Sequence, residues 1–447
     1  MTSVRIVHVL LIIILVLGFG IRLLNVRHYN TWWADDGGAH VAYVETILEH
    51  GRLPTMAETY VAWHEPLYYM TLAGWVALGR AVGLTSLDWW EFFSVVVGIA
   101  FLFTVWLLAL SYGADRWLAL ALVALFSFLF AGVKLSAYVT NELAAQTLMV
   151  LATALFLRWR LLETGQWKLV VLWAVVLLVA TLTKITAFVV LVAAAITWIA
   201  VAFFTRRRFT LGYLALTVAI VAAGNMPWFA YKYRHFDQLF SVNLYQEGAR
   251  QSMFRSEAYG YLFRFDYHIF WDQPYWVDET KSFAAILIAD AFSDHYNLFT
   301  NVDRLRDAPS RDKLLASGRF TTPRVRLAVL RAARVGLLVV SLWLVGLVGW
   351  LWRRGESLNG RSFADLFLFL LMLGSLGALV YENLLFPYLG LGVLKASFIY
   401  FAFPIVALLA GTWWWERCRS LLGRLLVFVG PIILYVVVSW SMLIIDS

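Results

Sequence analysis

Two neighbouring carboxylates, Asp35 and Asp36, follow the first apolar stretch of the chain, within Thr31-Trp-Trp-Ala-Asp-Asp-Gly-Gly-Ala-His40. Carboxylates at a membrane surface can take a proton from an attacking hydroxyl, hold a metal ion or orient a polar substrate. His40 lies one helical turn after Asp36, so both side chains can share one helix face. The alternative is that Asp-Asp-Gly-Gly is only a turn that caps a helix from about Gly37 to His50, which Gly51 and Pro54 end.

A second polar motif, Trp63-His-Glu-Pro-Leu-Tyr-Tyr69, contributes His64 and Glu65 to the same loop. Pro66 favours the first turn of a helix, which places His64 and Glu65 at a helix N-terminus. Free backbone N–H groups there favour anions, so a phosphate could bind. The alternative is that Glu65 only caps the helix and that His64 is an ordinary interfacial histidine.

Four further polar residues stand at the ends of apolar stretches: Asn141, Glu142, Lys184 and Lys395. A lysine in such a place can neutralise a lipid phosphate, or it can extend to the lipid headgroups without any site role. All four map to the same side of the membrane as the two motifs above in the topology that follows. This convergence predicts a single site.

The composition requires a polytopic membrane protein to position these residues. Apolar residues make up 62% of the 447 residues, charged residues make up 14%, and the mean hydropathy is +0.75, which excludes a soluble globular protein. Eleven stretches without charge approach the ~20 residues that a membrane-spanning helix needs. They lack the alternation of barrel strands, so we predict an all-α bundle of about eleven transmembrane helices. The stretches are 6–21, 92–114, 117–133, 143–157, 169–183, 185–205, 209–231, 335–352, 366–381, 396–415 and 425–445.

The basic residues predict the orientation of this bundle. With eleven spans and a cytoplasmic N-terminus, five clusters of arginine and lysine fall on the cytoplasmic face. The apolar stretch Pro66–Gly79 is too short to be a span and is interpreted as an interfacial or re-entrant helix. The net charge of +8 is then a topology signal and no argument for nucleic acid. An alternative for residues 1–24 is a cleaved signal peptide.

The predicted spans divide the chain into three parts. Residues 1–231 form a seven-span N-terminal module whose first outer loop, 25–91, holds interfacial helices. Residues 232–334 form a large extracytoplasmic segment, and residues 335–447 form a four-span block. The only cysteine, Cys418, excludes an intramolecular disulfide.

The extracytoplasmic segment contains two stretches of note. Aromatic residues between 259 and 276 could stack on a sugar or acceptor, or gather at the membrane interface. The stretch 281–292 is predicted to form a short surface helix. Asp290, Asp294 and His295 could ligate a metal, although their spacing is not diagnostic.

Taken together, these motifs resemble the C-type (GT-C) glycosyltransferases, in particular the protein O-mannosyltransferases and the lipid A aminoarabinose transferase. That group carries an acidic pair after its first span, which Asp35-Asp36 matches, and His64-Glu65-Pro66-Leu67 is similar to its His-Pro-Pro-Leu element. Further similar features are Asn141-Glu142, Leu182-Thr-Lys184, Pro227-Trp228, and Lys395-Ala-Ser-Phe-Ile-Tyr400 with Pro404. Asp36 departs from the usual Glu, and Glu65 from a Pro or Lys. The chain lacks a Trp-Trp-Asp motif, so the oligosaccharyltransferase branch is not expected.

The resemblance implies an inverting transfer of a sugar from a polyprenyl-phosphate donor to an acceptor hydroxyl at the extracytoplasmic face of a bacterial or archaeal plasma membrane. Asp35 would be the general base, with a pKa raised by its partly dehydrated surroundings. The other implied roles are orientation of donor or acceptor by Asp36, His40, His64, Glu65, Asn141 and Glu142, and binding of the lipid phosphate by Lys184 and Lys395. The acceptor could be a protein, a lipid or a glycan. The resemblance implies no required cofactor, and a divalent metal held by Asp36, His40 and Glu65 stays open.

Two other functions fit part of the pattern. A lipid-binding protein without catalysis would need the anion site but not the base. A membrane transporter or flippase could also carry carboxylates and lysines, but its coupling residues usually lie near the membrane midplane in related halves. We expect glycosyl transfer because the polar residues gather at one membrane surface.

Overall fold

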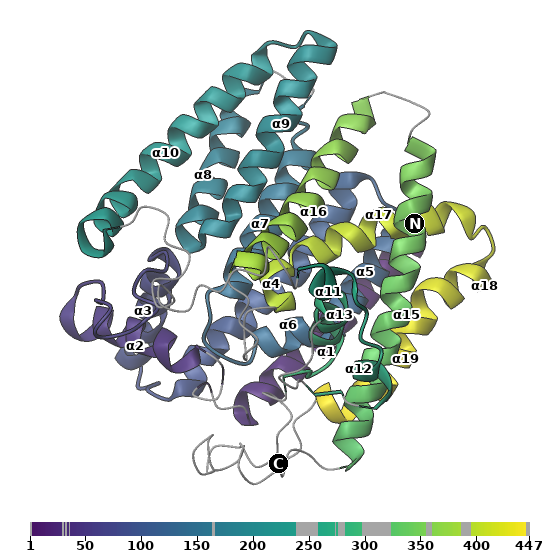
Figure 1. Ribbon diagram of the computed structural model, residues 1–447, viewed down its shortest axis with the longest axis horizontal. Helices are drawn as coiled ribbons and strands as arrows, with labels where there is room; N and C mark the ends of the chain where they lie inside the picture. Colours follow the sequence, from purple (N-terminus) through teal and green to yellow (C-terminus); the bar gives the residue numbers. More distant parts are fainter. Residues whose placement is uncertain are drawn as a thin grey trace.

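The computed structural model is a bundle of helices (Figure 1). It describes residues 2–28, 31, 34, 36–162, 166–237, 258–272, 274–275, 282–296, 323–354, 360–385 and 395–443. Within these ranges there is no β-strand, which confirms the prediction of an all-α protein.

Seven stretches in the described part of the chain are long and apolar enough to cross a membrane. They lie on α1 (Thr2–His28), α4 (Leu87–Tyr112), η2 and α9 (Ile185–Ala187 and Phe188–Thr205), α10 (Phe209–Phe236), α15 (Pro323–Arg354), α16 (Gly360–Leu385), and the run from α18 (Leu421–Arg424) to α19 (Gly430–Leu443). The other four predicted stretches form the shorter helices α5 (Arg116–Phe128), α7 (Glu142–Arg158), α8 (Trp167–Thr183) and α17 (Ala402–Arg417). The chain is therefore an integral membrane protein, and the count of eleven spans stays a prediction.

The first outer loop contains two short helices that lie beside the lower ends of α8 and α10 in Figure 1. Helix α2 (Gly37–His50) ends where predicted, at Gly51, whose φ of +64° is the left-handed conformation that suits glycine. Helix α3 (Leu67–Ala81) begins after Pro66 and has only 15 residues, too few to cross the bilayer. Both predicted helices are therefore present, and their location at the membrane interface stays a prediction.

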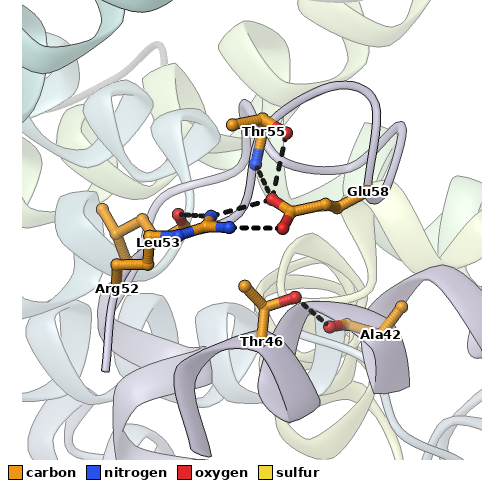
Figure 2. Close-up of polar contacts among 6 residues, drawn as sticks. All are labelled: Ala42, Thr46, Arg52, Leu53, Thr55 and Glu58. Atoms are coloured by element: carbon orange, nitrogen blue, oxygen red, sulfur yellow. Dashed lines mark hydrogen bonds and ion pairs between the residues drawn. The ribbon is translucent and has the colours of Figure 1, made fainter. Parts of the chain in front are cut away.

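The connection between α2 and α3 is held by its own polar side chains (Figure 2). Arg52 donates two hydrogen bonds to the carboxylate of Glu58, which also accepts from the backbone N–H of Thr55 at 2.7 Å. These contacts fold the loop back toward α2, where the Thr59 hydroxyl donates to the carbonyl of Ala39 at 3.0 Å. The loop thereby brings Tyr60 and His64 to the start of α2.

Two tryptophans fix α3 to α4. Trp75 and Trp89 stack with their ring centroids 4.3 Å apart, and each indole N–H donates to the other's backbone carbonyl. Gly79 permits this contact, since a Cβ there would lie 2.1 Å from the Trp89 ring. The first outer loop is therefore anchored on the bundle rather than loosely attached to it.

Helix α5 breaks at Leu129 and resumes as α6 (Phe130–Leu135), and Arg22 stabilises the break. Its guanidinium is buried and donates to the carbonyls of Gly18 and Ser127 at 2.9 and 2.8 Å and to the Ser136 hydroxyl at 3.1 Å. A helix end in an apolar interior needs such donors for its free carbonyls.

The stretch 281–292 does form a helix, α13 (Phe283–Phe292), but the prediction of a surface helix is wrong. Helix α13 packs against α6, α15 and η5 (Ala396–Ile399), and Ala285, Ala289 and Asp290 are fully buried. The reason is that the helix is apolar around most of its circumference, as is typical of buried helices. Part of the large outer segment therefore lies inside the bundle.

The aromatic stretch before α13 is divided between core and surface. It contains the short helices α11 (Ala258–Phe263) and α12 (His268–Trp271). Tyr261 and Phe270 are buried against α13 and its neighbours, whereas Phe263 and Trp271 are exposed. The buried members are therefore packing residues, and only the exposed ones remain free to contact a lipid or an acceptor.

Candidate functional site

Two predicted residues of the first outer loop, His40 and His64, meet at the hydroxyl of Tyr69. This hydroxyl lies 2.7 Å from Nδ1 of His40, on α2, and 2.9 Å from Nδ1 of His64, in the loop before α3. Tyr69 is fully buried and stacks on Tyr43 with a centroid separation of 3.8 Å. Burial lowers the pKa of His40 to about 4, and burial also lowers the pKa of His64 well below its usual value. Both imidazoles are therefore neutral at neutral pH.

Asp36 occupies the N-cap position of α2 but makes no capping hydrogen bond. Its carboxylate instead accepts a hydrogen bond from the hydroxyl of Tyr60. Burial alone would raise the pKa of Asp36, but the positive charge of Lys395, together with His40 and the Tyr60 hydrogen bond, lowers it to about 2. Asp36 is therefore a permanent anion at neutral pH, which suits orientation or charge balance better than proton uptake.

Lys184 and Lys395 are 211 positions apart in the sequence but lie on the same aromatic ring. The Nζ atoms of Lys184 and Lys395 are 5.2 and 5.9 Å from the ring centroid of Phe398, on η5. Lys184 stands between α8 and η2, and Lys395 immediately precedes η5. The structure thus brings together the two lysines predicted for the lipid phosphate, one from the N-terminal module and one from the C-terminal block.

Glu142 and Asn141 adjoin this lysine pair. Glu142 accepts a close ion-pair contact from Lys184, and its second oxygen is buried without a partner among the described residues. Asn141 donates to the carbonyl of Thr183 at 3.3 Å and leaves its own side-chain oxygen likewise unpartnered. Buried polar atoms without partners are costly and are often satisfied by a ligand or water.

Glu65 forms an ion pair with Lys232, a residue that the sequence analysis missed. Lys232, on α10, places Nζ 3.2 Å from Oε1 of Glu65, and both side chains are buried. The same ammonium lies between the rings of Trp63 and Trp228, at 5.6 and 5.5 Å from their centroids. The spacing of Trp228 and Lys232, one helical turn apart after Pro227, was the available signal. This pair ties the His64-Glu65 motif to the seventh predicted span.

A second residue that the sequence analysis missed is Glu382, on α16. It interacts electrostatically with both Lys184 and Glu142. A carboxylate that follows an apolar stretch directly, as in Tyr381-Glu382-Asn383, was the signal that could have found it. The C-terminal block therefore adds an acidic group as well as Lys395 to the site.

Asp35, the predicted general base, lies outside the described residues, so its role and its expected raised pKa stay predictions. Within the described ranges, no group of three histidine, cysteine, aspartate or glutamate side chains could hold a metal ion. Glu65 is paired with Lys232, and Nδ1 of His40 is bonded to Tyr69. Two of the three residues suggested for a divalent metal, Glu65 and His40, thus already have protein partners. A metal held by Asp36, His40 and Glu65 stays a prediction.

The three residues proposed as metal ligands near α13 are buried and differently engaged. Asp290 pairs with Lys134 at 2.8 Å and accepts from the backbone N–H of Ala396 at 2.8 Å. His295 donates from Nδ1 to the carbonyl of Pro274 at 2.8 Å. Because Ala396 directly follows Lys395, Asp290 holds the start of the segment that carries Lys395 and Phe398.

An apolar crevice lies elsewhere in the bundle, between α5, α15, α17 and α19. It encloses about 50 Å³ and is lined mainly by aliphatic and aromatic side chains, among them Leu125, Trp343 and Phe428. None of the candidate residues lines it. This crevice therefore gives no support for a polyprenyl groove beside the lysines.

No family model matches the sequence, and no curated protein matches it. The structure is similar to the archaeal oligosaccharyltransferase AglB from Archaeoglobus fulgidus in complex with an inhibitory peptide and a dolichol-phosphate, with a TM-score of 0.52, 11% identity, and coverage of 99% of this chain and 56% of that one. The A. fulgidus oligosaccharyltransferase in complex with Zn and sulfate gives a TM-score of 0.53 and 12% identity over 98% of this chain and 53% of the other.

ArnT from Cupriavidus metallidurans in the apo state gives a TM-score of 0.41 at 14% identity, over 92% of this chain and 78% of that one. This chain spans about half the length of the archaeal enzyme. The sequence had favoured the mannosyltransferase-like branch, whereas the matches with TM-scores above 0.5 are to an oligosaccharyltransferase. At these identities the likeness is one of architecture alone: the chain has the fold of these archaeal enzymes, and this is the GT-C fold that the sequence resemblance implied.

Proposed function

We propose that this protein is an inverting glycosyltransferase that moves a sugar from a polyprenyl-phosphate donor to an acceptor hydroxyl at the extracytoplasmic membrane face. The observation that carries the proposal is the placement of Lys184 and Lys395 on one Phe398 ring, beside the acidic and histidine residues of the first outer loop. Two cations that share one aromatic ring inside an apolar bundle are suited to an anion with more than one negative charge.

The donor's own chemistry explains why cations matter most. When the bond between the anomeric carbon and the phosphate oxygen breaks, the lipid phosphate gains negative charge as it leaves. Lys184 and Lys395 would stabilise that charge, and Lys184 would exchange part of its contact with Glu142 for the phosphate. The new bond forms on the opposite face of the sugar, so the anomeric configuration inverts.

The acceptor hydroxyl must lose its proton as it attacks. Asp35 is our candidate for the base, and Asp36 keeps a fixed negative charge beside it because nearby cations hold its pKa at about 2. Glu142 and Asn141 present unpartnered oxygens that would accept hydrogen bonds from sugar hydroxyls. His40, His64 and Glu65 would complete the wall that orients donor and acceptor.

A solved structure of similar fold supports this proposal. The AglB structure with the same fold holds a dolichol-phosphate, which is a polyprenyl phosphate, and an inhibitory peptide. We extend the first of these ligand classes to this chain because its two lysines offer an anion site.

The test is a mass-spectrometric assay of the purified protein against a panel of polyprenyl-phosphate sugars, with a cell extract as the source of acceptors. We expect release of free polyprenyl phosphate by the parent and a decrease of about 10²- to 10⁴-fold for Asp35→Asn, the usual contribution of a general base. Lys184→Ala and Lys395→Ala should each weaken release, whereas Lys168→Ala, an exposed lysine at the far end of α8 from Lys184, should not. Donor binding without release would instead indicate a non-catalytic lipid-binding protein.

A further inference from the structure

The hydrogen bonds that join the Tyr69 hydroxyl to His40 and His64 determine where the protons of these three side chains lie. The hydroxyl oxygen lies 2.7 Å from Nδ1 of His40 and 2.9 Å from Nδ1 of His64, both ordinary hydrogen-bond distances. The ring is fully buried and stacked on Tyr43, so the position of the hydroxyl is fixed by packing. The centroids of the two imidazole rings are 5.7 Å apart, which is too far for a direct hydrogen bond between the rings.

The number of available protons determines how these bonds are made. A phenol has one proton to donate, and a neutral imidazole carries a proton on only one of its two nitrogens. Both histidines are neutral because burial disfavours their charged forms. If Tyr69 donates to one Nδ1, the other Nδ1 must carry a proton and donate to Tyr69. The two histidines therefore hold opposite tautomers, one with a protonated Nδ1 and one with a protonated Nε2.

We propose that His40, Tyr69 and His64 form a proton relay that carries the acceptor's proton away from the carboxylates of the first outer loop. The proposal rests on the proposed function for its source of protons. A proton taken up at the bare Nε2 of one histidine pushes the Nδ1 proton of that ring onto the Tyr69 oxygen. The Tyr69 proton then passes to Nδ1 of the other histidine, which releases its Nε2 proton. One proton enters and one leaves, and every group ends neutral.

The surroundings favour transfer over storage of the proton. Asp36 interacts electrostatically with His40 and His64, so the relay begins near the Asp36 carboxylate. Lys184 and Lys395 act on His40, and Lys184 and Lys232 act on His64, each disfavouring a charged imidazole. A proton left on the base would also neutralise it before the next turnover. Passing the proton through neutral groups avoids both costs.

The first test reads the tautomers directly, without any substrate. Solid-state ¹⁵N NMR of protein labelled at histidine should show one of the two residues protonated at Nδ1 and the other at Nε2, assigned by comparison with His40→Gln and His64→Gln. His295, whose Nδ1 donates to the carbonyl of Pro274, provides an internal Nδ1-protonated reference. The same tautomer at His40 and His64 would overturn the relay, whatever the activity of the protein.

The second test uses Tyr69→Phe, which keeps the ring and removes the hydroxyl. We expect kcat for sugar transfer to fall about 10²-fold, the lower end for loss of a proton-transfer group, with donor affinity unchanged. The curved dependence of rate on the D₂O fraction expected for several moving protons should become linear. Tyr213→Phe is the matched control, because it removes the hydroxyl of a buried tyrosine at the opposite end of α10 from Lys232. This variant should retain the parent's kcat and its curved dependence on the D₂O fraction.

The outcomes separate the two proposals. A Tyr69→Phe protein that keeps the parent's kcat and isotope dependence, or that changes only its donor affinity, would overturn the relay while leaving transfer intact. If the parent transfers no sugar from any donor, the proposed function fails, and the tautomers of His40 and His64 still decide whether the relay geometry exists.

Discussion

Two buried ion pairs, Lys134–Asp290 and Lys184–Glu142, join distant parts of the chain but differ in how fully their polar atoms are used. Asp290 is 0% exposed, and its oxygens accept from Lys134 Nζ and from the backbone N–H of Ala396. In the other pair the side chains are 14% and 12% exposed, and one oxygen of Glu142 has no partner among the described residues. The first pair is satisfied by the protein alone, and the second is not.

This difference distinguishes an ion pair that supports the fold from one that can take part in ligand binding. A buried pair with every oxygen bonded holds segments in place, and here it links α6 and α13 to the start of η5, beside Lys395. A pair with an unused oxygen and partial access can exchange a protein contact for a ligand contact at smaller cost. Burial of charge alone therefore does not indicate a site; unused bonding capacity beside it does.

The largest expected effect is on stability at the first pair. Asp290→Ala should lower the free energy of unfolding by about 3–5 kcal/mol, because it leaves Lys134 charged and buried without a partner. Glu142→Ala should cost about 1 kcal/mol, since Lys184 is partly exposed and lies on the Phe398 ring. Chemical unfolding in detergent micelles, followed by tryptophan fluorescence, measures both.

A double variant is the control for the first pair. Lys134→Met with Asp290→Leu removes both charges together and should recover most of the lost stability, because a buried ion pair is often replaceable by apolar residues. Equal losses for Asp290→Ala and Glu142→Ala would remove the distinction between the two pairs.

The sequence predicts local structure well and long-range pairing poorly. Gly51 and Pro66 correctly predicted the end of α2 and the start of α3, because turn and helix-end chemistry depends on neighbouring residues. The burial of α13 was missed, because its only charge, Asp290, is paired with a lysine 156 positions away. The partnership of Glu65 with Lys232 was missed for the same reason, across 167 positions. The sequence predicted several of the residues that gather at the site, but it missed Lys232 and Glu382 and did not indicate which residues are already paired.

A smaller effect is expected from the charge on Asp36. The pKa of its carboxyl is lowered from 3.8 to about 2 in the folded protein, so the folded state binds this proton less tightly than the unfolded state does. The stability that follows, about 2 kcal/mol, is present above pH 4 and is lost as the pH falls through 2. Asp36→Asn should therefore be less stable than the parent at pH 7, and the two should converge near pH 2.

The measurement is the free energy of unfolding of the parent and of Asp36→Asn, compared between pH 7 and pH 2. Asp36 differs in this respect from a capping carboxylate, since its stabilisation comes from Lys395, His40 and Tyr60 rather than from the helix it precedes. A constant stability difference across this pH range would show that packing, not charge, distinguishes the variant.

The smallest expected effect is the response to a ligand, and it tests the two pairs against each other. Farnesyl phosphate, a short isoprenoid phosphate, should raise the unfolding temperature of the parent by binding only the folded state, with a gain of about 1.4 kcal/mol at ten times its dissociation constant. Lys184→Ala should lose this gain, because its ammonium is the one that can leave Glu142 for a phosphate. Lys134→Met, although less stable at the start, should show the parent's gain, since its partner Asp290 has no oxygen to spare. Equal responses of the two lysine variants would mean that phosphate binding does not depend on the unused capacity of the Lys184–Glu142 pair, and the distinction drawn from unpartnered atoms would then describe packing alone.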